Sequence, residues 1–494
     1  MGTLFRTKTV ERSIRETEAP GHRLRKDLTA LDLTVFGIGV IVGTGIFVLT
    51  GRVAREYAGP AVAVSFVVAG LVCALAALCY AEFASTVPVA GSAYTFSYAT
   101  MGEFPAWIIG WDLILEMALG AAVVAVGWSG YFTSLLSGFG IDLPASLAGE
   151  GARFNLPAVF IVLAATAVLT IGIKISSRIN ALMVAVKLAV VALVVIGGLF
   201  FVKAANYRPF IPPPQSTETV EGVRAPLIQV LFGLTPVAFG WFGVFSAVAI
   251  VFFAYIGFDV VATTAEEARR PQRDLPIGIL SSLGICTLLY VAVSLVVVGM
   301  QPYTELSEAA PLADAFKAVG RPFFAGVISV GAIFGLTTVV LILMLGQSRV
   351  FFAMSRDGLL PQWLAHVHPK YRTPARSTLF MGVVVAVLAG LIPLSALAEL
   401  VNIGTLFAFM LVSLGVLVLR RTRPDLRRAF RTPFVPLVPV LAALGSLFVM
   451  VNLPVETWIR FFVWMLVGTV IYLSYGRGHS KLQTSPEKSL RSVI

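Results

Sequence analysis

Residues 37–47 read GIGVIVGTGIF and place four glycines inside an apolar stretch long enough to cross a bilayer. A glycine inside a helix costs about 1 kcal/mol relative to alanine, and a break there frees backbone groups that hydrocarbon cannot satisfy. We therefore expect a broken helix, surrounded by protein or by a wet cavity, with amides and carbonyls available to hold a zwitterion. The alternative is close helix packing, because Gly39 and Gly43 also fit the small-xxx-small spacing.

The composition places the chain in the membrane. Apolar residues make up 57% of the 494 positions and charged residues only 13%. Many apolar runs approach the roughly 20 residues that a spanning helix needs. These numbers predict an all-α membrane protein with about 12 transmembrane helices. The expected windows are 31–53, 61–81, 105–136, 156–173, 179–202, 243–266, 275–299, 322–350, 378–394, 398–419, 435–453 and 459–475.

Basic residues set the expected orientation. Most of the 37 Lys and Arg residues fall in the two terminal tails and in the loops on their side. The positive-inside rule then places both termini in the cytoplasm and the protein in the cell membrane. The formal charge of +11 mainly reflects this topology, so no nucleic-acid partner is expected. The predicted segments are a cytoplasmic tail over 1–30, helices 1–5 over 31–202, an extracellular loop over 203–242, helices 6–10 over 243–419, a cytoplasmic loop over 420–434, helices 11 and 12 over 435–475, and a cytoplasmic tail over 476–494.

A second interruption falls in the sixth predicted span. Gly257 lies within the apolar run over 246–261, and Asp259 follows it. The first and sixth spans correspond if helices 1–5 and 6–10 are two copies of one unit. Because five is odd, the copies insert upside down relative to one another, as in many secondary transporters. Paired interruptions in corresponding spans predict a substrate site between them.

Residue types used for metal binding or covalent catalysis are not grouped in the spans. The cysteines lack a CxxC spacing and the histidines lie in tails or loops, which predicts no cofactor and no metal. A nucleophile elbow and a phosphate-binding loop are also missing, which argues against an enzyme. A channel would need repeated pore helices and a ring of filter residues rather than two interrupted helices. The residues concerned are Cys73, Cys79, Cys286, His22, His366, His368 and His479.

A series of motifs extends along the chain in a fixed order. They are the glycine-rich first span, YAEF at 80–83, PVAGSAY at 88–94, GWDLILE at 110–116, GFD at 257–259, EE at 266–267 with RPQRDLP at 270–276, and RVFFAMSRDG at 349–358. Together they resemble the amino acid-polyamine-organocation (APC) superfamily transporters, and most of all the bacterial cationic amino acid transporter subgroup. The resemblance implies a 5+5 inverted repeat with broken first and sixth helices, two extra carboxyl-terminal helices, and alternating access.

The same resemblance implies a substrate site at the two breaks. The first break would offer backbone amides to the substrate carboxylate, and the matching residues are Ile41, Gly43, Thr44 and Gly45. The sixth helix would offer carbonyls to the amine and apolar walls to the side chain, and the matching residues are Phe252, Phe253, Ala254, Tyr255 and Gly257. Half-helix amino ends attract anions and carboxyl ends attract cations, so opposed breaks form a dipolar clamp for an amino acid.

Lys187 lies well inside the fifth predicted span. A lysine at that depth costs several kcal/mol by insertion scales, which makes it a functional candidate; snorkelling to an interface is the alternative. A lysine enclosed away from water gives up its proton more readily, so we expect Lys187 to couple transport to a proton. The resemblance implies the same role, with the lysine replacing a sodium ion between the first and eighth helices near Thr337 and Thr338.

Carboxylates and one leucine bear on substrate choice. Asp112 and Glu116 are four residues apart on the third predicted span and share a helix face. Two interpretations of Glu116 stay open, contact with a substrate amine or cationic side chain and a structural hydrogen bond between spans. Asp259 is expected to cap amides freed by the second break. Leu336, a predicted pocket wall on the eighth span, favours small or medium neutral substrates, whereas Glu116 favours cationic ones.

These features predict a secondary active transporter that takes up an L-amino acid together with a proton, embedded in the lipid bilayer. Broad amino acid specificity is the first expectation. A transporter or exchanger of the cationic amino acids arginine, lysine and ornithine is the second. An amino acid sensor that binds without transporting would use the same site and is the alternative from another class.

Overall fold

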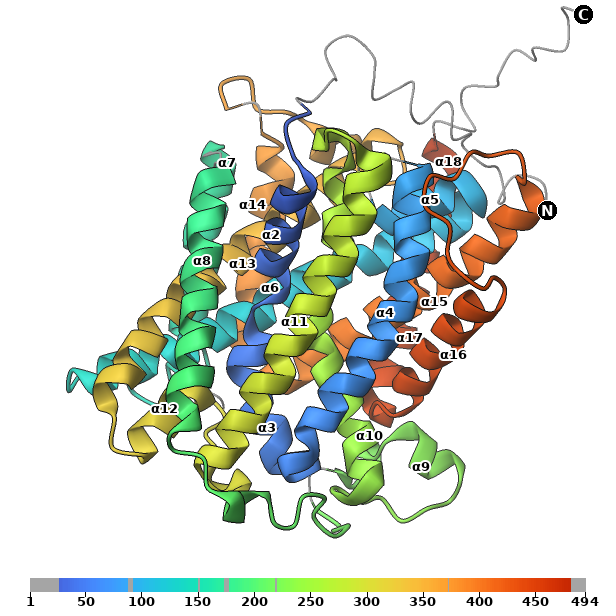
Figure 1. Ribbon diagram of the computed structural model, residues 1–494. Helices are drawn as coiled ribbons and strands as arrows, with labels where there is room; N and C mark the ends of the chain where they lie inside the picture. Colours follow the sequence, from blue (N-terminus) through green and yellow to red (C-terminus); the bar gives the residue numbers. More distant parts are fainter. Residues whose placement is uncertain are drawn as a thin grey trace, which may run out of the picture.

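The computed structural model describes residues 26–87, 92–149, 152–172, 177–217, 220–371 and 373–480 (Figure 1). These residues form helices and connecting loops, with no β-strand among them. The expected all-α, multi-span membrane fold is confirmed. The tail over 1–25, residues 88–91 of the PVAGSAY motif and the basic residues Lys174 and Arg372 lie outside the described residues.

The helices follow the predicted windows. Within the described residues, eight helical stretches are long and apolar enough to cross a membrane, and four shorter helices are also apolar. In chain order the α-helices are α2 (Ala30–Ile41), α3 (Thr50–Val53), α4 (Val62–Thr86), α5 (Ser92–Thr100), α6 (Glu103–Gly138), α7 (Leu156–Ile171), α8 (Ser177–Ala192), α9 (Leu227–Leu231), α10 (Gly240–Val251), α11 (Pro271–Met300), α12 (Pro311–Ala318), α13 (Pro322–Arg356), α14 (Ala375–Leu391), α15 (Leu394–Thr422), α16 (Leu437–Val451), α17 (Val455–Ile471) and α18 (Arg477–His479).

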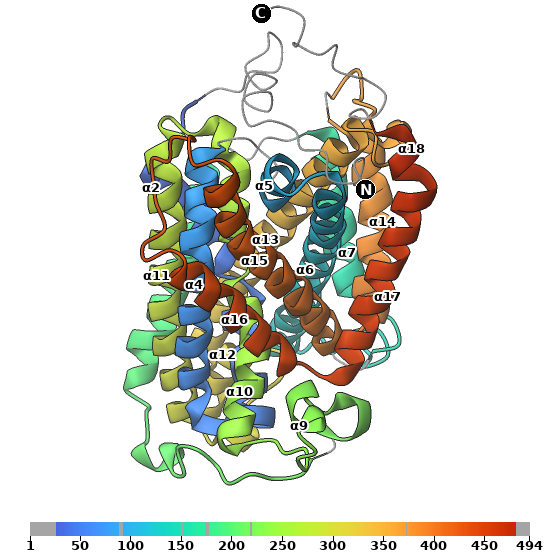
Figure 2. The same cartoon turned by 90° about the vertical axis from the view of Figure 1, so that its right-hand side faces the viewer.

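The third and sixth spans form the interior of the bundle. Of their most apolar windows, 89% is buried for α6 and 94% for the stretch Gly240–Ala265, compared with 22% for the stretch that contains α17. α6 packs against α13, α15 and α7, while α11 packs against α2 and α4. Figure 2 shows α15 running obliquely across the bundle and α4 beside α11. A substrate held by the first and sixth helices would therefore be enclosed by protein.

Candidate functional site

The first predicted span is broken next to Val42. α2 ends at Ile41, and Val42 has extended backbone with a ψ of 91°. Gly43 and Thr44 follow, and the helix resumes as the short segment η1 (Gly45–Leu49). The first amides of a resumed helix have no acceptor in a preceding turn, and the positive end of its dipole lies there. The break therefore presents hydrogen-bond donors suited to a carboxylate.

The sixth span is broken between two short 3₁₀ segments. α10 leads into η8 (Phe252–Tyr255), after which Ile256 is extended. Gly257 has a φ of 118°, in the left-handed region that glycine tolerates, and η9 (Asp259–Glu267) follows. The predicted interruption is thus present, and Gly257 is required by its backbone conformation.

The two breaks touch each other. A Cβ atom added to Gly45 would overlap the backbone and side chain of Ala254. A Cβ atom added to Gly257 would lie 2.6 Å from Cγ1 of Val40. Both glycines let the first and sixth helices approach at backbone distance, so half-helix ends from both spans converge on one region.

A small cavity of about 20 Å³ lies where the two breaks meet. Its walls are mostly apolar, and among its lining residues only Thr44 has a polar side chain, a hydroxyl. That hydroxyl is buried and has no hydrogen-bond partner within the described residues. A buried polar atom left unpaired is costly, which favours a ligand group beside it. The lining residues are Val40, Ile41, Gly43, Thr44, Gly45, Gly120, Val124, Phe253, Ile256, Val339 and Leu343.

Five predicted substrate residues line this cavity, Ile41, Gly43, Thr44, Gly45 and Phe253. The other sixth-helix candidates do not line the cavity but contact neighbouring helices. Phe252 packs against Phe409 of α15 with ring centroids 5.8 Å apart. The Tyr255 hydroxyl donates to the Phe66 carbonyl of α4 at 2.6 Å. Ala254 and Gly257 form the contact between the breaks described above.

Leu336 and Glu116 are buried beside the cavity rather than among its lining residues. Val339 and Leu343 line it instead, one and two turns further along α13. On α6, Gly120 and Val124 line it, one and two turns beyond Glu116. These four wall residues were not identified from the sequence, although their spacing from Leu336 and Glu116 follows the same helix faces.

Side chains from other helices donate hydrogen bonds to backbone carbonyl oxygens near the breaks. The Lys187 ammonium donates to the Gly39 carbonyl at 2.6 Å. The Tyr290 hydroxyl lies 2.6 Å from the Ile41 carbonyl oxygen and 2.7 Å from that of Ala254, so it bridges the two breaks. Asn402 of α15 donates in the same way to the carbonyls of Ala249 and Ile250, at 2.8 and 3.2 Å. Tyr290 and Asn402 were not identified from the sequence.

The surroundings of Lys187 match its expected place between the first and eighth helices. Its side chain is fully buried, and a Cβ atom added to Gly335 of α13 would lie 3.0 Å from its Cγ atom. Thr338 donates to the Gly335 carbonyl at 2.7 Å. Thr337 instead accepts from the indole of Trp128 at 3.0 Å, so it contacts α6.

Three buried carboxyl groups lie beyond the cavity, on α6 and after the second break. A Cβ atom added to Gly404 would lie 2.5 Å from Oδ1 of Asp112, which places Asp112 against α15. Glu116 is buried near Thr405 of α15, whose hydroxyl donates to the Val401 carbonyl at 3.0 Å. Asp259 is fully buried directly after the second break, near the backbone of Gly257 and Val260. Glu116 thus lies near α15 and outside the lining of the cavity.

Comparisons with known proteins agree with this geometry. The amino acid permease family model matches residues 28–472. The chain is 47% identical to the methylthioribose transporter of Bacillus subtilis (strain 168) over 487 residues, which cover 98% of this chain and 100% of the relative. It is 50% identical to the branched-chain amino acid permease BcaP of the same organism over 489 residues, or 97% and 99% of the two chains. It is 32% identical to the vacuolar cationic amino acid transporter 4 of Arabidopsis thaliana over 606 aligned positions, or 98% and 97%.

The matched relatives are transporters and not enzymes, and the family model spans nearly the whole membrane domain of this chain. The chain therefore belongs to the amino acid permease family of the APC superfamily, whose members are multi-pass membrane transporters.

Proposed function

We propose that this protein carries neutral, aliphatic L-amino acids of about the size of leucine across the cell membrane by alternating access. The observation that carries the proposal is the cavity between the two touching breaks. Backbone amides at one end suit a carboxylate, carbonyls near Ile41 and Ala254 suit an ammonium group, and the remaining walls are apolar. The similarity to the branched-chain amino acid permease supports the same substrate class.

Uptake together with a proton is the second part of the proposal. Lys187 supports it, because an amine buried in the membrane interior and bound to the first broken helix can gain or lose charge as water enters and leaves. A cationic lysine pairs strongly with the Gly39 carbonyl, and a neutral amine pairs less strongly. Protonation is thereby linked to the position of α2. We place both termini on the cytoplasmic side, following the basic loops.

The cavity walls favour neutral over cationic side chains. Val124, Val339 and Leu343 are apolar, and a lysine or arginine side chain placed among them would need a buried partner for its charge. Glu116 is the predicted partner, but it is buried near α15 and is not a wall residue. A cationic substrate would need Glu116 to turn towards the cavity.

Purified protein in sealed proteoliposomes tests the function. We expect labelled leucine to accumulate under an inward pH gradient, and valine and isoleucine to compete. Arginine should compete weakly, and so should methylthioribose, which has neither carboxylate nor ammonium. Binding without accumulation would identify a sensor, and uptake that requires an internal amino acid but no gradient would identify an exchanger. Stronger competition by methylthioribose than by leucine would reject the amino acid proposal.

Substitution of one wall leucine tests the side-chain pocket. Leu343→Ala enlarges the cavity, so competition by phenylalanine relative to valine should increase roughly tenfold, because a few methylene groups in an apolar pocket have about this effect. Inhibition constants for labelled leucine uptake provide the measurement. Leu336→Ala is the matched control, because it removes the same atoms from the same helix outside the lining residues. A change of preference in the Leu336 variant alone would make Leu336 the wall.

A further inference from the structure

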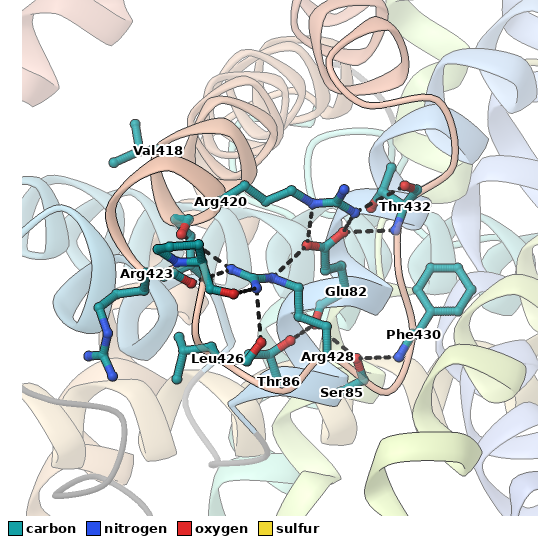
Figure 3. A network of polar contacts seen from close by, with 12 residues as sticks. Glu82, Ser85, Thr86, Val418, Arg420, Arg423, Leu426, Arg428, Phe430 and Thr432 are labelled. Carbon is teal, nitrogen blue, oxygen red and sulfur yellow. Dashed lines mark hydrogen bonds and ion pairs between the residues drawn. The ribbon is translucent and has the colours of Figure 1, made fainter.

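The loop between α15 and α16 is held against the end of α4 by hydrogen bonds, most of which converge on one carboxylate. Glu82 lies in the last turn of α4, with its side chain 2% exposed, and it accepts two hydrogen bonds from Arg420, at 3.0 and 2.8 Å (Figure 3). The amide of Thr432 donates to the same carboxylate at 2.8 Å, and Nε of Arg428 lies 3.3 Å from it. We call Glu82, Arg420, Arg428 and Thr432 the Glu82 cluster.

Arg428 also fixes the shape of the loop from within. Its side chain is 6% exposed, and its guanidinium donates to the carbonyls of Arg423 at 2.8 Å and Leu426 at 2.9 Å (Figure 3). Another bond reaches the Leu419 carbonyl at the end of α15. Carbonyls and one carboxylate thus hold the Arg428 fork, which leaves it no capacity for a ligand. These bonds give the loop one defined conformation, with the remaining arginine side chains on its exposed side.

The outer face carries positive charge that the Glu82 cluster does not use. Six arginines fall between positions 420 and 431, and Glu82 and Asp425 are the only carboxylates paired with them among the described residues. Arg421, Arg427 and Arg431 are exposed and make no ion pair within those residues. Three guanidinium groups thus remain available at the end of a membrane helix.

Exposed apolar side chains follow these arginines in the chain, at the start of the next membrane helix. Phe434 is 80% exposed and Leu437, the first residue of α16, is 57% exposed. Because α16 is one of the apolar helices of the bundle, its first residue marks the level at which the protein meets lipid. Exposed guanidiniums next to exposed aromatic and aliphatic groups at that level match a headgroup joined to acyl chains.

We propose that this loop binds the headgroup of an anionic phospholipid. Arg421, Arg427 and Arg431 would pair with the phosphate, because guanidinium groups bind phosphate oxygens in a two-pronged manner. Phe434 and Leu437 would lie along the adjoining glycerol and acyl chains. A clustered set of arginines directly at a helix end is the arrangement by which membrane proteins recognise anionic lipid. The proposal is independent of which substrate the protein carries.

The site is connected to the second break through both helices of the Glu82 cluster. On α4, Tyr80 contacts Phe258, with ring centroids 5.7 Å apart. On α15, Phe409 contacts Phe252 and Phe258, at 5.8 and 4.9 Å. A lipid that holds the loop against α4 would therefore stabilise the two helices that flank the sixth-span break.

Thermal unfolding in detergent with added lipid provides the test. Dioleoylphosphatidylglycerol should raise the unfolding temperature by about 4 °C or more above the value with dioleoylphosphatidylcholine. The variant Arg421→Gln/Arg427→Gln/Arg431→Gln should need roughly tenfold more of the anionic lipid for half its stabilisation. Added salt should weaken the effect in the wild type, because exposed charges are screened.

A matched control separates the site from net charge. Arg269→Gln/Arg270→Gln/Arg273→Gln removes three other exposed arginines, two before α11 and one in its first turn, and should respond to the lipid as the wild type does. Equal loss in both triple variants would reduce the effect to general attraction and overturn the proposal. Equal stabilisation by inorganic phosphate would also overturn it, because the ligand would then be a free anion rather than a lipid.

Discussion

Lys187→Ala is expected to abolish the accumulation of amino acid under an imposed pH gradient while exchange across the membrane continues. The variant removes the buried ammonium that donates to Gly39 at 2.6 Å, and with it the charge that responds to the proton. A gradient of one pH unit corresponds to about 1.4 kcal/mol per proton. Coupling to one proton therefore raises the ratio of internal to external substrate about tenfold per unit. Uptake into proteoliposomes with and without a gradient, together with counterflow, measures the two activities separately.

Lys203→Ala is the control for this experiment, because Lys203 follows the same membrane segment but is exposed in a loop. It should keep the full response to the gradient. If uptake by the Lys187 variant still rose tenfold with each unit of the inward gradient, the proton would have to bind elsewhere. The carboxyl groups of Asp112 and Glu116 would be the next residues to substitute.

Gly45→Ala should eliminate substrate binding, whereas Gly43→Ala should only weaken it. The methyl group at position 45 would overlap Ala254, so the two breaks would separate and the carbonyls near them would move; overpacking of this kind costs about 1–3 kcal/mol or more. At position 43 the nearest atoms to a new methyl group are those of Val339, at 3.5 Å, an ordinary contact distance. Binding of labelled leucine to purified variants measures the difference.

The pair of glycine variants is informative because both positions line the same cavity. Gly43→Ala should leave the unfolding temperature close to that of the wild type, and the Gly45 variant should lower it. Equal loss of binding in two equally stable variants would show that the volume of the cavity matters and the contact between the breaks does not.

The breaks were predictable from the sequence, whereas the residues that complete the site were not. Glycine within an apolar span has a local cost, so its presence in the first and sixth spans indicated unusual backbone before any contact was known. Val339 and Leu343 carry no such indication, because an apolar wall residue has the same chemistry as a residue of the core. Their role depends on the rotation of α13 relative to the cavity, which distant contacts determine.

Polar residues that hydrogen-bond to partners far away in the sequence could not be predicted either. Tyr290 is 249 residues from Ile41 in the sequence, and Asn402 is 153 residues from Ala249. A tyrosine or asparagine in an apolar helix satisfies its hydrogen bonds wherever the fold brings a free carbonyl, so its partner depends on how the helices are arranged. Lys187 was identifiable because a charge at that depth is rare enough to demand an explanation.

At the bridge formed by Tyr290, the carbonyl oxygens can accept more hydrogen bonds than the tyrosine hydroxyl can donate. A hydroxyl has one proton to donate, whereas the carbonyl oxygens of Ile41 and Ala254 offer four lone pairs between them. A primary ammonium group has three N–H donors and a positive charge, so it can donate hydrogen bonds to the remaining lone pairs. The deaminated analogue 4-methylpentanoate has the same apolar chain and carboxylate but supplies no donor. A site built to hydrogen-bond a group can reject the analogue lacking it by as much as about 10⁴-fold. Selectivity for an amine would thus come from the unpaired acceptor capacity of the Ile41 and Ala254 carbonyls, which the Tyr290 hydroxyl holds close together.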